Sequence, residues 1–324
     1  MKFGLFIESD QDQFSKAVEQ AELAEDLGYD SISVAEHHNA IGYLPLPLVV
    51  LAAFAARTRR VELVSNIVIL PLYHPVQVAE QAAMVQFISK GRLVLGVGLG
   101  YLPEEFASVS VPFEERAGRM AESLGLLKRL WTEEDVSFDG RFYKFTHATV
   151  QPRLGALGPP TVLVGGWVEA AIRRAAQLAD GWMPGPTVDF QTLRDCYSIY
   201  RDESERQGKA VSSEYMASRE MFCAPTHEQA VEVGGKAIYR FYKDTYLQWP
   251  HPLLREAERK MSYEELCRDR FIVGDPDECA EEVGKLREMG ITHLTFRIQQ
   301  PGVSWEDSVA SMKLFKQEVA SRFH

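Results

Sequence analysis

Short apolar runs of strand length alternate with amphipathic segments along the first third of the chain. Four such runs occupy residues 3–7, 31–35, 61–70 and 93–97. The segments between them carry apolar residues at helical spacing, over 15–27, 47–56 and 76–88. Gly28 directly follows the first of these segments as a C-terminal cap, and Pro75 stands where the third helix is expected to begin. Three consecutive strand–helix–strand units predict a parallel sheet covered by helices.

The same alternation resumes after residue 113 and continues to the end of the chain. The pattern predicts further strands over 161–164, 181–183, 215–223 and 293–298. It predicts further helices over 114–131, 169–178, 190–206, 276–289 and 305–323. Eight strands in alternation with helices favour a closed (β/α)8 TIM barrel of the α/β class over an open doubly wound sheet. A barrel of this kind accounts for all 324 residues as a single domain, 1–324.

Two insertions interrupt the alternation. Residues 136–145 predict a β-hairpin, because strand-forming residues flank the turn-forming pair Asp139-Gly140. Residues 234–272 are too many for a simple connection, and they are rich in aromatic and charged residues and contain Pro250 and Pro252. We expect a partly helical excursion there. Two interpretations stay open for it: a mobile lid over the active site, or a surface helical pair with no catalytic role.

Charge and cysteine content narrow the class of protein. The formal net charge is −11, from 35 basic and 46 acidic residues, which disfavours nucleic acid and anionic membranes as partners. The amino terminus lacks the pattern of a signal peptide, and no apolar run reaches the roughly 18 residues that span a bilayer. Four widely spaced cysteines without a Cys-x-x-Cys pair indicate reduced thiols. We therefore expect a cytoplasmic protein.

The carboxyl ends of the strands are where a barrel of this kind places its active site. The densest polar cluster there is Glu36-His37-His38, at the end of the second strand. Only one of the two histidines can point into the site if the strand stays regular, because neighbouring side chains alternate. Histidine and carboxylate can bind a metal, or a lone histidine can act in proton transfer beside an organic cofactor. We favour the second interpretation and predict no metal site, because His74 and His293 lack ligand-like pairing with carboxylates.

Two glycine clusters also follow predicted strands. Residues 96–101 read Gly-Val-Gly-Leu-Gly-Tyr, and such glycines allow a flat ring or a phosphate to approach the backbone. Gly165-Gly166 comes directly before a predicted helix, whose first N–H groups and dipole can bind an anion. Close packing at the first cluster and an ordinary tight turn at the second would explain the same residues.

Several stretches together resemble the bacterial luciferase-like flavin-dependent monooxygenases, over nearly the full length of the chain. The most specific are the Glu-His-His triplet at residue 36 and the Leu-Pro-x-x-His-Pro-Val run that begins at Leu70. Further similar stretches are Ala24–Ser31, Ser89–Gly98 and Gly274–Pro276.

The resemblance implies a role for particular residues. His37 matches the histidine that assists proton transfer beside the flavin ring, and Asn66-Ile67 matches a position where the family often has a non-proline cis peptide. The cofactor-binding residues that the resemblance implies are Glu36, Asn66, Ile67, Gly98, Gly100, Tyr101, Gly165, Gly166, Trp167, Val168 and Glu169. The chain departs from bacterial luciferase at Leu99, where luciferase has an arginine for the flavin phosphate. It also has Trp167-Val168 in place of a serine-bearing phosphate loop.

The resemblance also implies an activity. The leading hypothesis is a monooxygenase that receives reduced FMN from a separate flavin reductase and uses O2 to oxidise a small apolar substrate, such as an aldehyde or ketone. The alternative is hydride transfer with the deazaflavin coenzyme F-420. A metal-dependent barrel hydrolase and a non-catalytic flavin-binding protein are weaker hypotheses. Family members are often homodimers through helices near strands two and three, so a homodimer is expected.

Overall fold

The structure, a computed structural model, describes residues 1–7, 14–38, 43–209, 215–250, 253–254, 256–297 and 299–323. Nine parallel strands form one curled sheet, in the order β10-β9-β11-β1-β2-β3-β4-β7-β8. Their bounds are β1 Lys2–Phe6, β2 Ser31–Val34, β3 Glu62–Ile69, β4 Leu93–Gly98, β7 Thr161–Val164, β8 Gly181–Trp182, β9 Met216–Cys223, β10 Ile272–Gly274 and β11 His293–Arg297. The antiparallel hairpin of β5 (Val136–Asp139) and β6 (Lys144–Ala148) forms a separate sheet.

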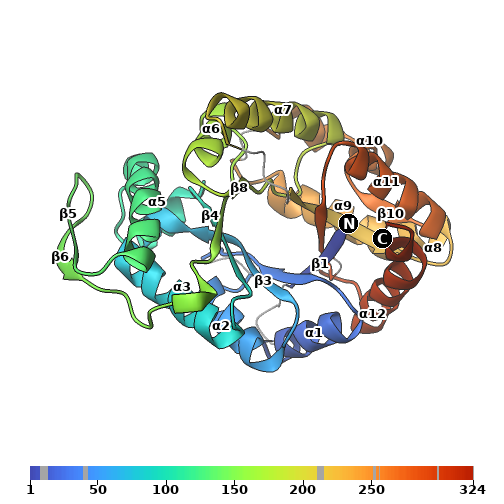
Figure 1. Cartoon of the computed structure of the whole chain (residues 1–324). Coiled ribbons are helices and arrows are strands. Elements are labelled where there is room, and N and C mark those ends of the chain that lie inside the picture. The colour runs from blue at the N-terminus through green and yellow to red at the C-terminus, as the bar shows by residue number, and fades with distance from the viewer. Residues whose placement is uncertain are drawn as a thin grey trace.

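Helices surround this sheet on its outer side, and the hairpin projects beyond their ring (Figure 1). The α-helices are α1 Phe14–Asp26, α2 Pro47–Arg57, α3 Pro75–Ser89, α4 Pro103–Ser108, α5 Arg116–Thr132, α6 Glu169–Leu178, α7 Phe190–Arg206, α8 His227–Ala230, α9 Lys236–Phe241, α10 Tyr263–Cys267, α11 Pro276–Glu288 and α12 Trp305–Leu314. Shorter 3-10 and π turns are η1 Leu70–Leu72, η2 Phe113–Glu115, η3 Gly155–Leu157, η4 Val231–Gly235, η5 Tyr242–Tyr246, η6 Glu256–Lys260, η7 Phe315–Val319 and η8 Ala320–Phe323. The two chain ends meet, because the Met1 amino group donates to the Phe323 carbonyl oxygen at 2.9 Å.

The predicted α/β barrel is confirmed, and all eight predicted strands are present to within one residue at each end, Ile298 lying outside the described residues. The pattern missed β10 and the short helix α4. The prediction of a two-residue Asp-Gly turn in the hairpin was wrong. Asp139 pairs with Lys144, so the loop consists of the four residues 140–143. The predicted C-terminal cap is correct, since Gly28 has a φ of +82° and donates to the Glu25 carbonyl.

Side chains join β8, at one edge of the sheet, to β9, which lies next to the other edge strand β10. No backbone ladder joins these two strands within the described residues. The ring of Trp182 on β8 instead stacks on Tyr215, immediately before β9, with ring centroids 5.8 Å apart and planes 22° from parallel. Aromatic packing thus replaces hydrogen bonding at this seam.

Three side chains also hold the segment that leaves β8. Each donates a hydrogen bond to one of three consecutive carbonyl oxygens, and all three carbonyl groups belong to residues that line the central cavity described below. The pairs are Arg219 to Gly185 at 3.3 Å, Tyr242 to Pro186 at 3.0 Å and Arg270 to Thr187 at 2.6 Å. Two of the donors come from the insertion between β9 and β10, so this insertion is part of the barrel wall.

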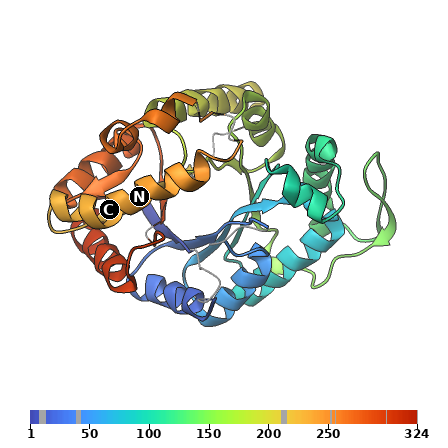
Figure 2. The ribbon, with the colours of Figure 1, turned by 180° about the vertical axis from the view of Figure 1, so that it is seen from behind.

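The insertion packs on the barrel as a second apolar cluster. Its helical part, η4, α9 and η5, buries Ile238, Phe241 and Tyr242 against Phe222 of β9 and Phe271. From behind, this part extends from the ring of helices across part of the barrel end (Figure 2). The expected partly helical excursion is therefore present. Its burial against β9 makes it more than a surface helical pair.

A fully buried histidine lies at the start of β11. His293 shares a hydrogen bond of 2.7 Å with the Ser31 hydroxyl, and burial lowers its pKa to about 3, with a smaller contribution from Lys2. As the pH falls below about 6.5, the unfolded chain binds a proton at this residue and the folded chain does not. The stability that neutral His293 contributes is thus complete above pH 6.5 and is lost towards pH 3.

We expect His293→Gln to reduce the acid sensitivity of the fold. The wild type should lose up to about 1.4 kcal/mol of unfolding free energy per pH unit below pH 6.5 from this residue, and the amide variant should not. Urea unfolding at pH 7.0, 6.0 and 5.0 measures the difference. His227→Gln, at an exposed histidine, is the control and should keep the wild-type slope. Equal slopes in wild type and His293→Gln would contradict the assignment.

Candidate active site

A cavity of about 510 Å³ lies at the carboxyl ends of the strands, and most of its lining is apolar. Every predicted site residue lines it except Glu169. The other wall residues include members of β1, β9, β11, α4, α5, the insertion and the segment that follows β8, so the cavity depends on segments from the whole chain. They include Phe6, Tyr43, Glu105, Arg116, Met183, Ser218, Arg219, Tyr246 and Arg297.

Glu36 is buried and lines the cavity, and groups of the protein itself donate hydrogen bonds to both oxygens of its carboxylate. One oxygen accepts from the Ile69 backbone N–H at 2.6 Å, and the other accepts from Tyr73 and from Nε2 of His38 at 2.7 Å. The hydrogen bond to Glu36 raises the pKa of His38, and burial partly opposes this. Contact of Glu36 with a cofactor stays a prediction.

His37 lines the cavity and His38 does not, in agreement with the expectation that a single histidine points inward. The reason differs from the expected one, because β2 ends at Val34 and the triplet is no longer regular strand. Nδ1 of His37 lies 3.0 Å from Oε1 of Glu105, and the same oxygen accepts from the His38 backbone N–H at 2.9 Å. An ionised Glu105 accepts from Nδ1–H, which leaves Nε2 as the basic nitrogen of His37.

Glu105 is the functional residue that the sequence pattern missed. It is buried, and its Oε2 atom has no hydrogen-bond partner among the described residues. It lies on the short helix α4, which the pattern did not predict, and 68 residues separate it from His37. The acidic pair Glu104-Glu105 after the glycine cluster was the one available signal.

The peptide bond between Asn66 and Ile67 is cis, at the position that the resemblance implied. The register of β3 against β4 shifts at this point. The Ile67 side chain occupies the space of two missing Cβ atoms: a Cβ on Gly98 would lie 2.5 Å from its Cδ1, and one on Gly165 would lie 3.2 Å from its Cγ2. Both glycines line the cavity, and the absence of a side chain at these positions leaves room for Ile67.

The start of α6 offers backbone N–H groups to an anion. Gly166 has a φ of +147°, and a Cβ there would lie 2.7 Å from Ala171, so the turn needs glycine. Val168 precedes the helix without a side-chain cap, and the N–H groups of 168–170 have no backbone partner in the described part of the chain. This helix start can bind a phosphate.

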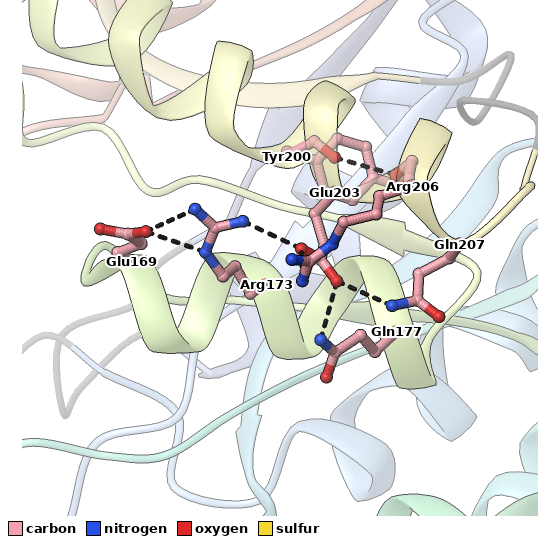
Figure 3. A network of polar contacts seen from close by, with 8 residues as sticks. Glu169, Arg173, Gln177, Tyr200, Glu203, Arg206 and Gln207 are labelled. Carbon is pink, nitrogen blue, oxygen red and sulfur yellow. Dashed lines mark hydrogen bonds and ion pairs between the residues drawn. The ribbon is translucent and has the colours of Figure 1, made fainter.

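Glu169, the predicted site residue outside the cavity, instead belongs to a surface network (Figure 3). Its carboxylate accepts from Arg173 one turn later on α6, and Arg173 also donates to the buried Glu203 on α7. Hydrogen bonds from Gln177, Arg206, Gln207 and Arg173 lower the pKa of Glu203 to about 2. The network holds α6 against α7. Because the Glu169 side chain is paired with Arg173, only its backbone N–H can still serve in the predicted cofactor site.

Arg116 places a cation on the wall of the cavity. Its guanidinium lies 3.8 Å above the Phe113 ring and donates to the Phe113 carbonyl oxygen at 2.8 Å. Both residues line the cavity together with Val168 and Ala171 at the start of α6. The sequence pattern did not identify Arg116, because it stands in a loop-to-helix junction without a motif.

No group of three or more His, Cys, Asp or Glu side chains among the described residues is arranged to hold a metal ion. No helix in the part of the chain that the structure describes has the length and apolar character to cross a membrane.

The chain is similar in sequence to known enzymes. A model of the luciferase-like monooxygenase family matches residues 1–293. The 4-hydroxyprotoasukamycin monooxygenase of Streptomyces nodosus subsp. asukaensis is 30% identical over 323 residues, 95% of this chain and 86% of that protein. An F420-dependent glucose-6-phosphate dehydrogenase of Nakamurella multipartita is 27% identical, over 99% of this chain and 96% of its own.

A solved structure shares the fold. It is the oxygenating constituent of 3,6-diketocamphane monooxygenase from Pseudomonas putida, a type II Baeyer–Villiger monooxygenase in complex with FMN. The TM-score is 0.84 at 20% identity, and the match covers 99% of this chain and 98% of that one. At this identity the likeness concerns the fold alone.

Proposed function

Since the chain belongs to the luciferase-like monooxygenase family, we propose that it is a monooxygenase that uses reduced FMN and O2 to oxidise a small apolar substrate. The observation that carries the proposal is the His37–Glu105 pair on the wall of a largely apolar cavity. The prediction of an oxidoreductase agrees with the activities named for both relatives.

The residues present fit a flavin with its phosphate at one end. The apolar lining suits a flat ring, and the free N–H groups at the start of α6 with Arg116 suit a dianionic phosphate. Asn66, Ile67, Gly98 and Gly165 would then lie against the ring. Bound reduced flavin supplies the two electrons with which one atom of O2 enters the substrate and the other becomes water.

In this proposal His37 is the residue that transfers the proton. Glu105 fixes the imidazole with Nδ1 protonated, so that Nε2 can accept a proton from a group in the cavity and return it. The carboxylate also stabilises the positive charge that forms on the ring. The apolar walls exclude water from the reacting groups. A separate flavin reductase would supply the reduced cofactor, and a small aldehyde, ketone or similar molecule would be the substrate.

The first prediction concerns cofactor choice and the role of Arg116. Titration of the purified protein, followed by flavin absorbance and fluorescence, should show reduced FMN binding more tightly than riboflavin, which lacks the phosphate. Arg116→Gln should weaken FMN binding about tenfold and leave riboflavin binding unchanged, because a charge-assisted hydrogen bond contributes about 1.5 kcal/mol or more. Preferential binding of coenzyme F-420 would move the protein to the hydride-transfer alternative, which the F420-dependent relative supports.

The second prediction concerns proton transfer. His37→Ala should lower turnover by about two orders of magnitude or more, as for other general acid–base groups. Glu105→Gln keeps the shape of the side chain and removes its charge, so it should lower turnover less than His37→Ala does. Single-turnover oxidation with reduced FMN and excess O2 measures both. Turnover of His37→Ala within tenfold of wild type would remove His37 from the mechanism.

We also propose that the protein is a homodimer. Large apolar side chains are exposed along α2 and α3, which pack side by side. They are Leu46, Val49, Met84, Phe87 and Ile88, with exposed fractions from 38% to 59%. Large exposed apolar side chains on neighbouring helices often mark an interface.

Sedimentation velocity should therefore give twice the chain mass of 36.6 kDa. Phe87→Glu places a charge in the apolar face and should release monomers, whereas Leu178→Glu, on the exposed side of α6, should not. A wild-type monomer at micromolar concentration would contradict the proposal.

A further inference from the structure

Trp249, near the end of the helical part of the insertion, contacts the catalytic histidine. Its ring centroid lies 4.7 Å from that of His37, with the planes tilted by 45°. The same indole also lies near three tyrosines that line the cavity: Tyr43 at 6.0 Å, Tyr101 at 5.9 Å and Tyr246 at 5.7 Å. Trp249 thus joins rings from the loops after β2 and β4 to the insertion.

The barrel itself fixes the place of this indole. Arg297, on β11, donates to the Tyr246 hydroxyl at 2.8 Å, and Tyr242 donates to the Pro186 carbonyl oxygen after β8. Both tyrosines belong to η5, which ends three residues before Trp249. The insertion is therefore attached to the barrel both at β11 and at the segment after β8, and these attachments place Trp249 against His37.

His37 needs a second contact because its hydrogen bond leaves one degree of freedom. The bond from Nδ1 to Glu105 restrains one edge of the imidazole, but the ring can still tilt about that contact. Trp249 packs against the ring, while Tyr43 meets it edge-on at 4.5 Å and 74°. The side chain of His37 is consequently only 12% exposed.

From this packing we propose that Trp249 is a positioning residue: it holds the imidazole of His37 in the orientation that presents Nε2 to the cavity, and it keeps bulk water from the His37–Glu105 pair. The proposal rests on the proton-transfer role assigned to His37 above. Misplacement of a catalytic group by about 1 Å can lower the rate by about a hundredfold, so a packing contact at this position affects chemistry. A merely structural Trp249 would stabilise the insertion without any effect on the imidazole.

The direct test observes the imidazole in the cofactor-free protein. The 15N spectrum of protein labelled at histidine should show His37 as a single Nδ1–H tautomer, identified by the signals that disappear in His37→Gln. Trp249→Ala should broaden these signals or mix the two tautomers, and Trp249→Phe, which keeps an aromatic ring, should largely restore them. Trp305→Phe, at the first residue of α12, is the matched control and should leave them unchanged.

Two results would overturn the proposal. One is a His37 spectrum in Trp249→Ala that is identical to that of the wild type. The other is equal broadening in Trp305→Phe, which would indicate general loosening of the fold. If Trp249→Ala does not fold, as judged by circular dichroism, the same comparison is made with Trp249→Leu, which fills the space without a ring. Because no cofactor is present, failure of flavin binding cannot be mistaken for failure of this test.

A second readout connects the contact to function. With reduced FMN and substrate, Trp249→Ala should lower kcat roughly tenfold to a hundredfold and shift the pH profile of kcat, while Trp249→Phe should recover most of the rate. A change in KM alone would overturn the positioning role, because it would place Trp249 in substrate binding.

Discussion

The catalytic end of the barrel depends on one buried carboxylate, that of Glu36. A buried charge is costly unless hydrogen bonds satisfy it, and this one accepts from the Ile69 backbone, from Tyr73 and from His38. These bonds tie the end of β2 to the end of β3 and to the turn that follows. With His38 held by Glu36, the neighbouring His37 is left to face the cavity. The triplet thus places a structural anchor next to the residue that we propose for proton transfer.

The opposite side of the barrel relies on side chains rather than on a ladder. Arg219, Tyr242 and Arg270 donate to three consecutive carbonyl groups after β8. Burial lowers the pKa of Arg219 to about 10, so it is still charged at neutral pH. Since Tyr242 belongs to the insertion, that segment supports the cavity wall as well as covering part of the barrel end. The insertion therefore has to pack tightly if the segment after β8 is to keep its place in the cavity wall.

The sequence predicts the elements better than their contacts. Periodicity identified the eight strands because most of them bury short apolar runs, and the resemblance located the cis bond at Asn66. Glu105 escaped because its role requires contact across 68 residues, which no local pattern contains. Gly98 was expected to make room for a cofactor, and its missing side chain makes room for Ile67 first. Trp249 was one aromatic residue among several in the insertion until the fold brought it to the histidine.

The phosphate end of the cavity bears on how long a cofactor stays. Leu99 stands where bacterial luciferase has an arginine, and Arg116, the cation that we propose for the phosphate, is only partly buried and lies over Phe113. Arg173 forms an ion pair with Glu169, so the negative charge of Glu169 at the start of α6 is partly neutralised. Backbone N–H groups and one partly buried arginine would bind a phosphate with moderate strength, weakened further by salt screening. On the proposed function, moderate binding would favour a flavin that exchanges with a separate reductase over one that stays bound as a prosthetic group.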